Sequence, residues 1–304
     1  MTLFLIQALN GVQFGLILFL IAAGLTLVFG IMDFVNLAHG VQYMLGAYLA
    51  ASAAAWTDSF TWGLVLALPG SLLIGLCLER LVFRHLYGRS HLDQVLATFG
   101  VIIFLTAATK AIWGVSSISV GMPAALSGSV EIAGALQYPV WRLVIIAAGL
   151  GVAALLYIVV NHTRLGMLMR AGATNAEMVS ALGVNVSVLF MLVLGFGAML
   201  AGFAGAMVAP ILSVDPGMGD SVLILAFVVI VVGGIGSIRG AFIAALLIGL
   251  VDTLGRFLAP TLLRTVLDAS AASQIGRAIG PMLVYVLMSV MLAVKPAGLF
   301  PARR

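Results

Sequence analysis

Long apolar runs dominate this chain, and short polar segments separate them. The runs cover residues 4–30, 38–56, 62–83, 94–113, 140–160, 186–212, 221–237, 240–258 and 279–295. Most approach the roughly 20 apolar residues that an α-helix needs to cross the hydrocarbon core of a bilayer. Apolar and polar residues do not alternate with a period of two, as they would in the strands of a membrane barrel. The pattern therefore predicts an all-α polytopic membrane protein, a single domain over residues 1–304 with eight or nine transmembrane helices.

Two of the separating segments, residues 30–40 and 232–240, are short, glycine-rich and partly polar. Irregular backbone at membrane depth is tolerated only where protein or a water-filled cavity satisfies it. Paired interrupted helices of this kind often mark the substrate path of a transporter. Two interpretations stay open: broken or re-entrant segments that line a path, or tight hairpins at the membrane surface. The candidate path residues are Asn36, His39, Gly40, Gly233, Gly234, Gly236 and Arg239.

A loop at about residues 161–185 holds a candidate short helix. Thr174 and Glu177 have the spacing of a capping box, and Gly183 is a plausible helix stop. One face of this helix carries Met178, Ala181 and Leu182. A helix of about two turns is not stable alone in water. It must therefore dock either on the membrane body of its own chain or in a groove of a partner.

Composition agrees with a membrane protein, because 63% of the 304 residues are apolar and only 8% are charged. A soluble domain carries about 25% charged residues. We therefore expect membrane lipid to be the partner that covers the apolar surface of this chain. The net charge of +4 is spread between the apolar runs and forms no basic patch, which argues against nucleic acid as a partner. No Lys or Arg precedes the first run, so we expect a retained span with its N-terminus outside.

Basic residues near the ends of the runs predict the orientation, because Lys and Arg accumulate on the cytoplasmic side. The side richer in them holds Arg80, Arg84, Arg89, Arg164, Arg170, Lys295, Arg303 and Arg304. The other side holds Lys110, Arg142, Arg256, Arg264 and Arg277. The loop at 161–185 and the C-terminus are therefore predicted to be cytoplasmic.

The sequence offers little for catalysis. The His-Glu-x-x-His and Gly-x-Ser-x-Gly patterns are absent, and the four histidines lack metal-ligand spacing. We expect neither an enzyme nor a metal or cofactor site. The Walker A pattern is also absent, so energy comes from another chain or from an ion gradient. Candidate ion relays are Asp33, His39, Arg239 and Asp252, although Arg256 is placed to pair with Asp252 within one helix.

Several blocks across the chain resemble the H-type subunit of the branched-chain amino-acid permease family. They are NGV at 10–12, GLTLVFG at 24–30, NLAHG at 36–40, YMLGAY at 43–48, ER at 79–80, LGVN at 182–185 and VGGIGSIRG at 232–240. Ala176 and Glu177, followed by Gly183, are similar to the short cytoplasmic signature of ABC-importer permeases. In those permeases an interfacial helix sits in a cleft of the ATPase.

The resemblance implies a type II-like ABC importer permease in a bacterial inner membrane. Such a subunit forms half of a translocation path, beside a second related permease, two cytoplasmic ATPase subunits and a periplasmic substrate-binding protein. It also implies ATPase coupling through Thr174, Ala176, Glu177, Met178, Leu182 and Gly183. The implied substrates are branched-chain or related amino acids, amides or urea, selected mostly by the binding protein. The alternative of an ion-gradient-driven secondary transporter stays open.

Overall fold

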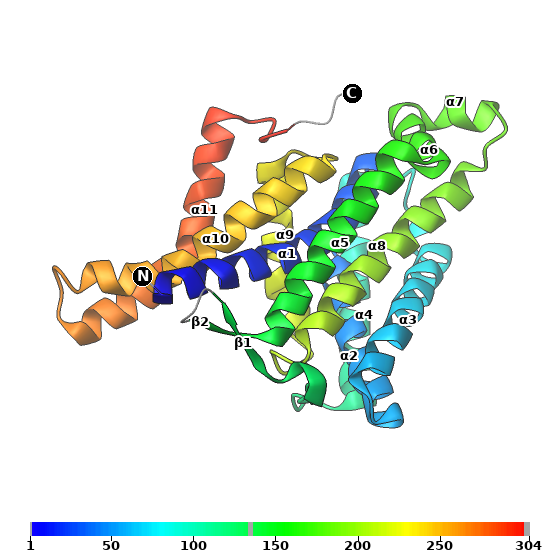
Figure 1. Cartoon of the computed structure of the whole chain (residues 1–304). Helices are drawn as coiled ribbons and strands as arrows, with labels where there is room; N and C mark the ends of the chain where they lie inside the picture. The colour runs from blue at the N-terminus through cyan, green and yellow to red at the C-terminus, as the bar shows by residue number, and fades with distance from the viewer. Residues whose placement is uncertain (1, 133–135, 301–304) are drawn as a thin grey trace.

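The computed structural model describes residues 2–132 and 136–300 and is built almost entirely from helices (Figure 1). The α-helices are α1 (Thr2–Met32), α2 (His39–Thr57), α3 (Phe60–Leu81), α4 (His91–Trp113), α5 (Val140–His162), α6 (Arg164–Thr174), α7 (Ala176–Ala181), α8 (Val186–Val208), α9 (Met218–Gly233), α10 (Ile238–Leu263) and α11 (Ala269–Val294). Short 3-10 helices lie at η1 (Phe83–His85) and η2 (Ala124–Leu126). One small antiparallel hairpin joins β1 (Ser129–Ile132) to β2 (Leu136–Pro139). The predicted all-α architecture is confirmed.

Each of the nine predicted runs corresponds to a helix. In the described part of the chain, seven helices are long and apolar enough to cross a membrane. The other two are α9, which is apolar but has only 16 residues, and α2, which has 19 residues but is less apolar. These two helices account for the difference between seven spans and the predicted eight or nine.

The gap predicted between the apolar runs 240–258 and 279–295 is wrong in its extent. α10 continues to Leu263 and α11 already begins at Ala269. The Asp268 side chain caps α11 by accepting a hydrogen bond from the Ala271 amide over 3.4 Å. The polar residues at the start of α11 interrupt the apolar run, but they do not interrupt the helix, because a polar stretch with a good N-cap remains helical.

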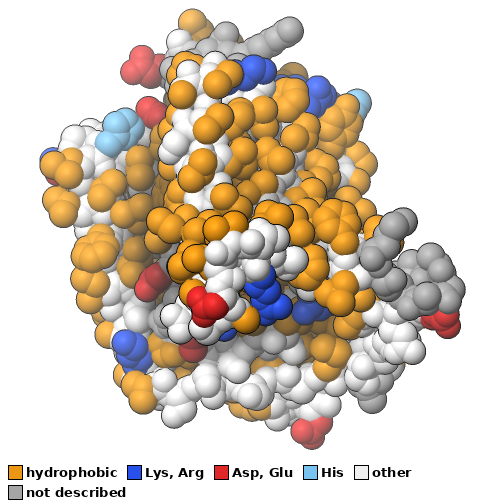
Figure 2. Space-filling view, turned by 90° about the vertical axis from the view of Figure 1, so that its left-hand side faces the viewer, with side chains coloured by type: hydrophobic (Ala, Val, Ile, Leu, Met, Phe, Trp, Pro, Cys, Tyr) orange, Lys and Arg blue, Asp and Glu red, His pale blue; other side chains and the backbone are white. Residues whose placement is uncertain are grey.

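The helices divide into an inner and an outer group. In the most apolar 18-residue stretch of α1, 78% of the residues are buried within the chain. In the corresponding stretches of α4 and α11, only 17% and 11% are buried. Large apolar side chains on the outer helices are exposed, as Phe104 of α4 is at 70%. Figure 2 shows hydrophobic side chains over much of one such face. This distribution is typical of a bundle surrounded by lipid, since a soluble protein rarely exposes such large apolar patches.

α2 lies inside the bundle, where it packs against α3, α8 and α9. Small residues permit this close packing. A Cβ atom on Gly46 would lie 2.1 Å from the Cα atom of Gly202 in α8. A Cβ atom on Gly205 would lie 2.0 Å from the Tyr43 carbonyl oxygen. Small residues at helix contacts let backbones approach in a membrane, and a helix shielded from lipid can carry polar side chains.

The loops collect at two ends of the bundle. At one end, which we call the α7 end, the Leu299 amide donates to the Val232 carbonyl over 2.9 Å. At the other, the hairpin end, Ile118 pairs with Val214 as an isolated bridge, and the Trp113 indole donates to the Ser52 hydroxyl over 2.7 Å. Figure 1 shows α6, α7 and the C-terminal segment at the top and the β-hairpin at the bottom.

Candidate translocation and coupling sites

The segment between α1 and α2, residues 33–38, is held by an aromatic cluster. Asp33 ends α1 with a φ of +50°, in the left-handed region. Phe34 is fully buried, with its ring centre 5.4 Å from that of Phe83 and 5.8 Å from that of Tyr87. The Tyr87 hydroxyl donates to the Glu79 carboxylate over 2.9 Å. Burial, and then the nearby Glu79 charge, raise the pKa of Tyr87, so this hydroxyl stays a hydrogen-bond donor.

Gln94 of α4 fixes the backbone of the same segment. Its side chain is buried and accepts a hydrogen bond from the Val35 amide over 3.1 Å. The side-chain amide nitrogen donates to the Leu86 carbonyl over 3.3 Å. Sequence reasoning missed Gln94. The only available signal was a polar residue at the start of an apolar run, and its partner lies 59 residues away.

The first break turns back into the bundle before α2 begins. The His39 Nε2 atom lies 3.0 Å from the Ile21 carbonyl oxygen, and a Cβ atom on Gly24 would lie 3.0 Å from the His39 ring. Ile21 and Gly24 lie two to three helical turns before the end of α1 at Met32, which is about 12 to 16 Å along the helix. His39 therefore starts α2 well below the α7 end, so this break re-enters.

Several buried polar atoms on this stretch lack a hydrogen-bond partner among the described residues. Asn36 is fully buried with both amide atoms unpartnered, and the same holds for the amide atoms of Gln42. His39 Nδ1 and Thr26 Oγ1 are also unpartnered in the described part of the chain. Native proteins pair the great majority of their buried polar groups. Leaving several such atoms without hydrogen bonds costs free energy. The start of α2 is therefore a candidate functional region.

α9 also begins inside the bundle. A Cβ atom on Gly40, at the start of α2, would lie 2.5 Å from the carbonyl oxygen of Gly219, at the start of α9. The N-terminal ends of α2 and α9 thus touch. Because α9 begins inside the bundle, it rises only about 24 Å, against about 30 Å for the hydrocarbon core.

The second break is a tight turn between α9 and α10. Gly234 and Gly236 have φ values of 102° and 79°, which favour glycine. A Cβ atom on Gly233 would lie 2.5 Å from the Gly240 carbonyl carbon. The Ser237 hydroxyl caps α10 by accepting from the Gly240 amide over 3.1 Å. The hairpin interpretation therefore holds for this break.

The two breaks meet at the α7 end. A Cβ atom on Gly30, in the last turns of α1, would lie 2.6 Å from the Cα atom of Gly236. The C-terminal segment covers the second break, since the Phe300 amide donates to the Gly233 carbonyl over 3.0 Å. The structure therefore brings together segments about 200 residues apart in the sequence.

Arg239 points away from this group. Its side chain is exposed, and its guanidinium carbon lies 5.4 Å from the centre of the Tyr157 ring of α5. It borders a groove of about 360 Å³ between α5 and α10. The seven candidate path residues therefore fall into three places: Asn36, His39 and Gly40 at the buried start of α2, Gly233, Gly234 and Gly236 in the turn at the α7 end, and Arg239 facing α5.

The short helix at the loop of 161–185 is α7, and its N-cap differs from the prediction. Asn175, not Thr174, caps it, with the Asn175 side-chain oxygen accepting from the Met178 amide over 2.9 Å. Thr174 is the last residue of α6, and its hydroxyl donates to the Arg170 carbonyl over 3.0 Å. Asn175 has the extended backbone of an N-cap, whereas Thr174 remains helical. The predicted capping role of Thr174 is therefore wrong.

One face of α7 is buried against its own chain and the other is exposed. Val179 is 5% exposed, whereas Met178 and Leu182 are 59% and 77% exposed. Glu177 is also exposed in the first turn, where a carboxylate favours the helix dipole. Gly183 follows with a φ of +86°. α7 lies at one far end of the molecule (Figure 1), so the exposed apolar side chains of Met178 and of Leu182, which directly follows the helix, lie there too.

Three charged residues within the helices, Asp252, Arg256 and Arg142, have polar partners. The predicted pair of Asp252 and Arg256 is confirmed, with two contacts of 2.9 Å between guanidinium and carboxylate. At the hairpin end, Arg142 donates to the side-chain oxygens of Asn10 over 2.6 Å and of Gln13 over 3.2 Å. The Tyr138 hydroxyl also donates to Asn10. This network ties the start of α5 to α1, and sequence reasoning missed it because its members are more than 120 residues apart.

Comparison with known proteins gives one consistent family. Residues 7–294 match the family described as branched-chain amino acid transport system / permease component. The chain is 31% identical to the high-affinity branched-chain amino acid transport system permease protein BraD of Pseudomonas aeruginosa, over 83% of this chain and 86% of that protein. It is also 31% identical to the corresponding LivH protein of Escherichia coli K12, over 83% and 85% of the two chains.

A more distant relative is the probable branched-chain amino acid transport permease protein LivH of Methanocaldococcus jannaschii, which is 24% identical over 78% of this chain and 76% of that protein. No solved structure matches the chain. Since the family match extends over nearly all of the helical bundle, this chain belongs to the permease-component family of branched-chain amino acid transport systems.

Proposed function

We propose that this chain is the membrane-spanning permease subunit of an ATP-driven importer for branched-chain amino acids. The observation that carries the proposal is the family match over residues 7–294 on a bundle of apolar helices. The names of the relatives support leucine, isoleucine and valine as substrates. The proposed partners are a second related permease, two cytoplasmic ATPase subunits and a periplasmic binding protein, in a bacterial inner membrane.

Uptake in proteoliposomes tests this function. The chain is reconstituted with the permease, ATPase and binding-protein subunits of its transport system. We expect uptake of radiolabelled leucine that requires internal ATP and is unaffected by a proton or sodium gradient. Uptake driven by a gradient, without the ATPase subunits, would instead support a secondary transporter and contradict the proposal.

The exposed face of α7 supports a role in coupling to the ATPase. Met178 and Leu182 are apolar and face outward, while Val179 anchors the helix to its own chain. We propose that the ATPase covers the exposed pair, with Thr174, Ala176, Glu177 and Gly183 shaping the helix and its ends. An exposed apolar face at the tip of a membrane protein is typical of a protein contact.

Crosslinking tests the coupling role in a background in which Cys77 is replaced by alanine. We expect Met178→Cys to form a crosslink to a cysteine in the ATPase cleft, at a rate that changes with bound nucleotide. Val179→Cys, which is buried, is the matched control and should not crosslink. No crosslink from either Met178→Cys or Leu182→Cys, in a complex that transports leucine, would exclude α7 as the coupling helix.

We further propose that the two breaks support the substrate path. Asn36, His39 and Gly40 lie at the re-entrant start of α2, and Gly233, Gly234 and Gly236 form the adjoining turn. The unpartnered side-chain amide atoms of Asn36 and Gln42 support this proposal. Buried polar atoms that lack hydrogen-bond partners in one conformation of a transporter can gain partners in another. Arg239 is left out, since it faces α5. The reactivity of a cysteine at position 36 during transport tests the proposal.

A further inference from the structure

The groove between α5 and α10 is a candidate binding site outside the proposed path and coupling helix. Both helices pack on α1, and the space between them is a groove of about 360 Å³. Its apolar lining includes Phe19 of α1, Leu156 of α5, and Phe242 and Ile243 of α10. The groove is therefore a surface valley with an apolar floor, and in a bilayer it faces the acyl chains.

Positive charge lies at one end of this groove. Arg239 is the second residue of α10, so it lies at the end of that span nearest the α7 end. Its guanidinium stacks on the Tyr157 ring at 5.4 Å. Within the described residues, no carboxylate lies within 4.0 Å of it. The aromatic contact orients the guanidinium and leaves its charge unneutralised.

A second guanidinium is close by. Arg170 of α6 donates a hydrogen bond to the carbonyl oxygen of Val160, and Val160 lines the groove. Arg170 also has no carboxylate within ion-pair distance in the part of the chain that the structure describes. The remaining polar lining at this end is Asn161. Arg239 thus lines the groove directly, and Arg170 contacts it through the backbone of Val160, at the depth where helices leave the hydrocarbon.

We propose that this groove binds an anionic phospholipid, with its phosphate group at Arg239, on the side near Arg170, and one acyl chain along the accessible side chains of Phe242 and Ile243. Guanidinium groups bind phosphate oxygens through paired, charge-assisted hydrogen bonds. Basic pockets between transmembrane helices are suited to anionic headgroups. The bilayer itself supplies this ligand. An anionic phospholipid combines a negatively charged headgroup, which matches the charge at the end of the groove, with an apolar tail, which matches its lining.

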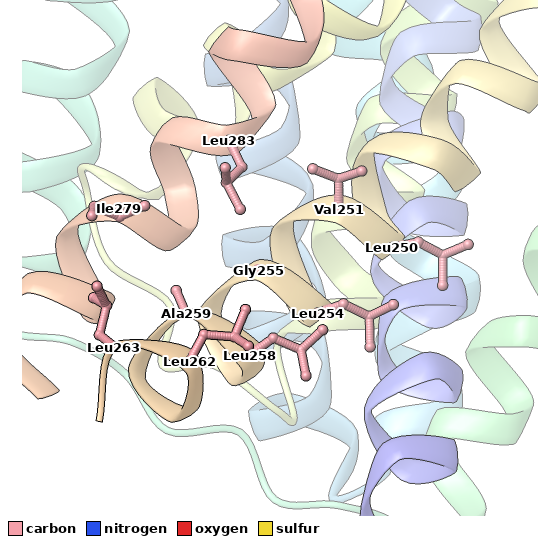
Figure 3. Close-up of a pocket in the computed structure, with 10 residues that line it drawn as sticks. All are labelled: Leu250, Val251, Leu254, Gly255, Leu258, Ala259, Leu262, Leu263, Ile279 and Leu283. Atoms are coloured by element: carbon pink, nitrogen blue, oxygen red, sulfur yellow. The ribbon is translucent and has the colours of Figure 1, made fainter. Parts of the chain in front are cut away.

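A second groove provides an internal comparison. It lies between α10 and α11, has a volume of about 480 Å³, and is lined only by apolar residues and glycine. Figure 3 shows Ile279 and Leu283 of α11 across from Leu258 and Leu262 of α10. This groove can hold an acyl chain but offers no cation to a headgroup. Of these two grooves, only the α5–α10 groove should therefore select for a lipid headgroup.

Lipid binding to the purified complex tests the proposal. Native mass spectrometry would compare phosphatidylglycerol with phosphatidylcholine on the wild-type complex and on the double variant R239Q/R170Q. We expect the wild type to prefer phosphatidylglycerol, and the double variant to bind it roughly tenfold or more weakly. R239K keeps a charge and should retain much of the preference. R264Q, which removes an exposed arginine beyond the other end of α10, is the matched control and should bind as the wild type does.

Three outcomes would overturn the inference. The first is equal binding of the two lipids by the wild type. The second is an unchanged preference in R239Q/R170Q when gel filtration shows an intact complex. The third is a photo-crosslinker at Phe242 that reacts with the second permease subunit and not with lipid, because the groove would then be a subunit interface. Crosslinking of Phe242 to the acyl chain of phosphatidylglycerol would support the inference.

Discussion

At the residue scale, side-chain caps define where the helices of the α7 end begin. Asn175 caps α7, and Asn185 caps α8 by accepting from the Val188 amide over 3.2 Å. Thr163 caps α6 in the same way through the Gly166 amide. The spacing of Thr174 and Glu177 satisfied the capping pattern, but the neighbouring Asn175 is at least as good an N-cap. Only the backbone conformation distinguishes the two.

A pair of alanine substitutions tests this assignment. Asn175→Ala should destabilise α7 by about 1 kcal/mol, which increases its opening roughly fivefold, because the Met178 amide loses its acceptor. Thr174→Ala should have a smaller effect, since its hydroxyl bonds to the preceding turn of α6. Hydrogen exchange of the amides of residues 176–182 measures both. Faster exchange in Thr174→Ala than in Asn175→Ala would instead support Thr174 as the N-cap of α7.

At the scale of elements, the two helices that fall outside the span criteria are the two that begin inside the bundle. Gly40 and Gly219 bring the N-terminal ends of α2 and α9 into contact. The first amide groups of a helix lack intrahelical acceptors, so a buried helix start is polar even where its side chains are not. The unpartnered side chains of Asn36 and Gln42 add to this polarity. The re-entrant break is thus a polar region deep in the described bundle.

Cysteine accessibility tests whether this region becomes wet during transport. In a Cys77→Ala background, Asn36→Cys should be unreactive to a water-soluble thiol reagent in the resting complex, because Asn36 is fully buried. It should react during ATP turnover. Gly100→Cys, on the exposed face of α4 with nothing within 4 Å, reports a lipid-facing position and should stay unreactive. Protection of Asn36→Cys in every nucleotide state would exclude the path proposal.

At the scale of the whole molecule, the long helices hold two sets of loops apart, and the two ends differ in their charged residues. Arg84, Arg89 and Arg170 are exposed at the α7 end, together with the C-terminal segment. The hairpin end carries Asp58 and Glu131 alongside Lys110 and Arg142. Since cytoplasmic loops are enriched in Lys and Arg, the α7 end is proposed to be cytoplasmic. This orientation is also the one in which α7 can reach an ATPase.

Labelling from one side of the membrane tests the orientation. In the same Cys77→Ala background, Gly128→Cys and Thr265→Cys should react with an impermeant thiol reagent added to intact spheroplasts. Gly88→Cys and Ala297→Cys should react only after the membrane is permeabilised. Gly88 and Gly128 are suitable because a Cβ atom at either would meet nothing within 4 Å. The reverse labelling pattern would place α7 outside and exclude an ATP-driven importer.

The sequence by itself determined the class of fold, because helices in lipid need long apolar runs and nine such runs are visible. It also located both breaks and the short helix of the coupling loop, since glycine and polar residues interrupt the runs there. Tertiary structure alone decided that the first break re-enters while the second turns, because this depends on contacts such as His39 with Ile21.

The same holds for residues whose partners are distant in the chain. Gln94 and Arg142 act through atoms 59 to 132 residues away. Arg239 was grouped with the path by its place in a glycine-rich motif, but it faces Tyr157 of α5. Local pattern predicts where the helices lie along the chain, whereas the direction in which a side chain points is set by the helices that pack beside it.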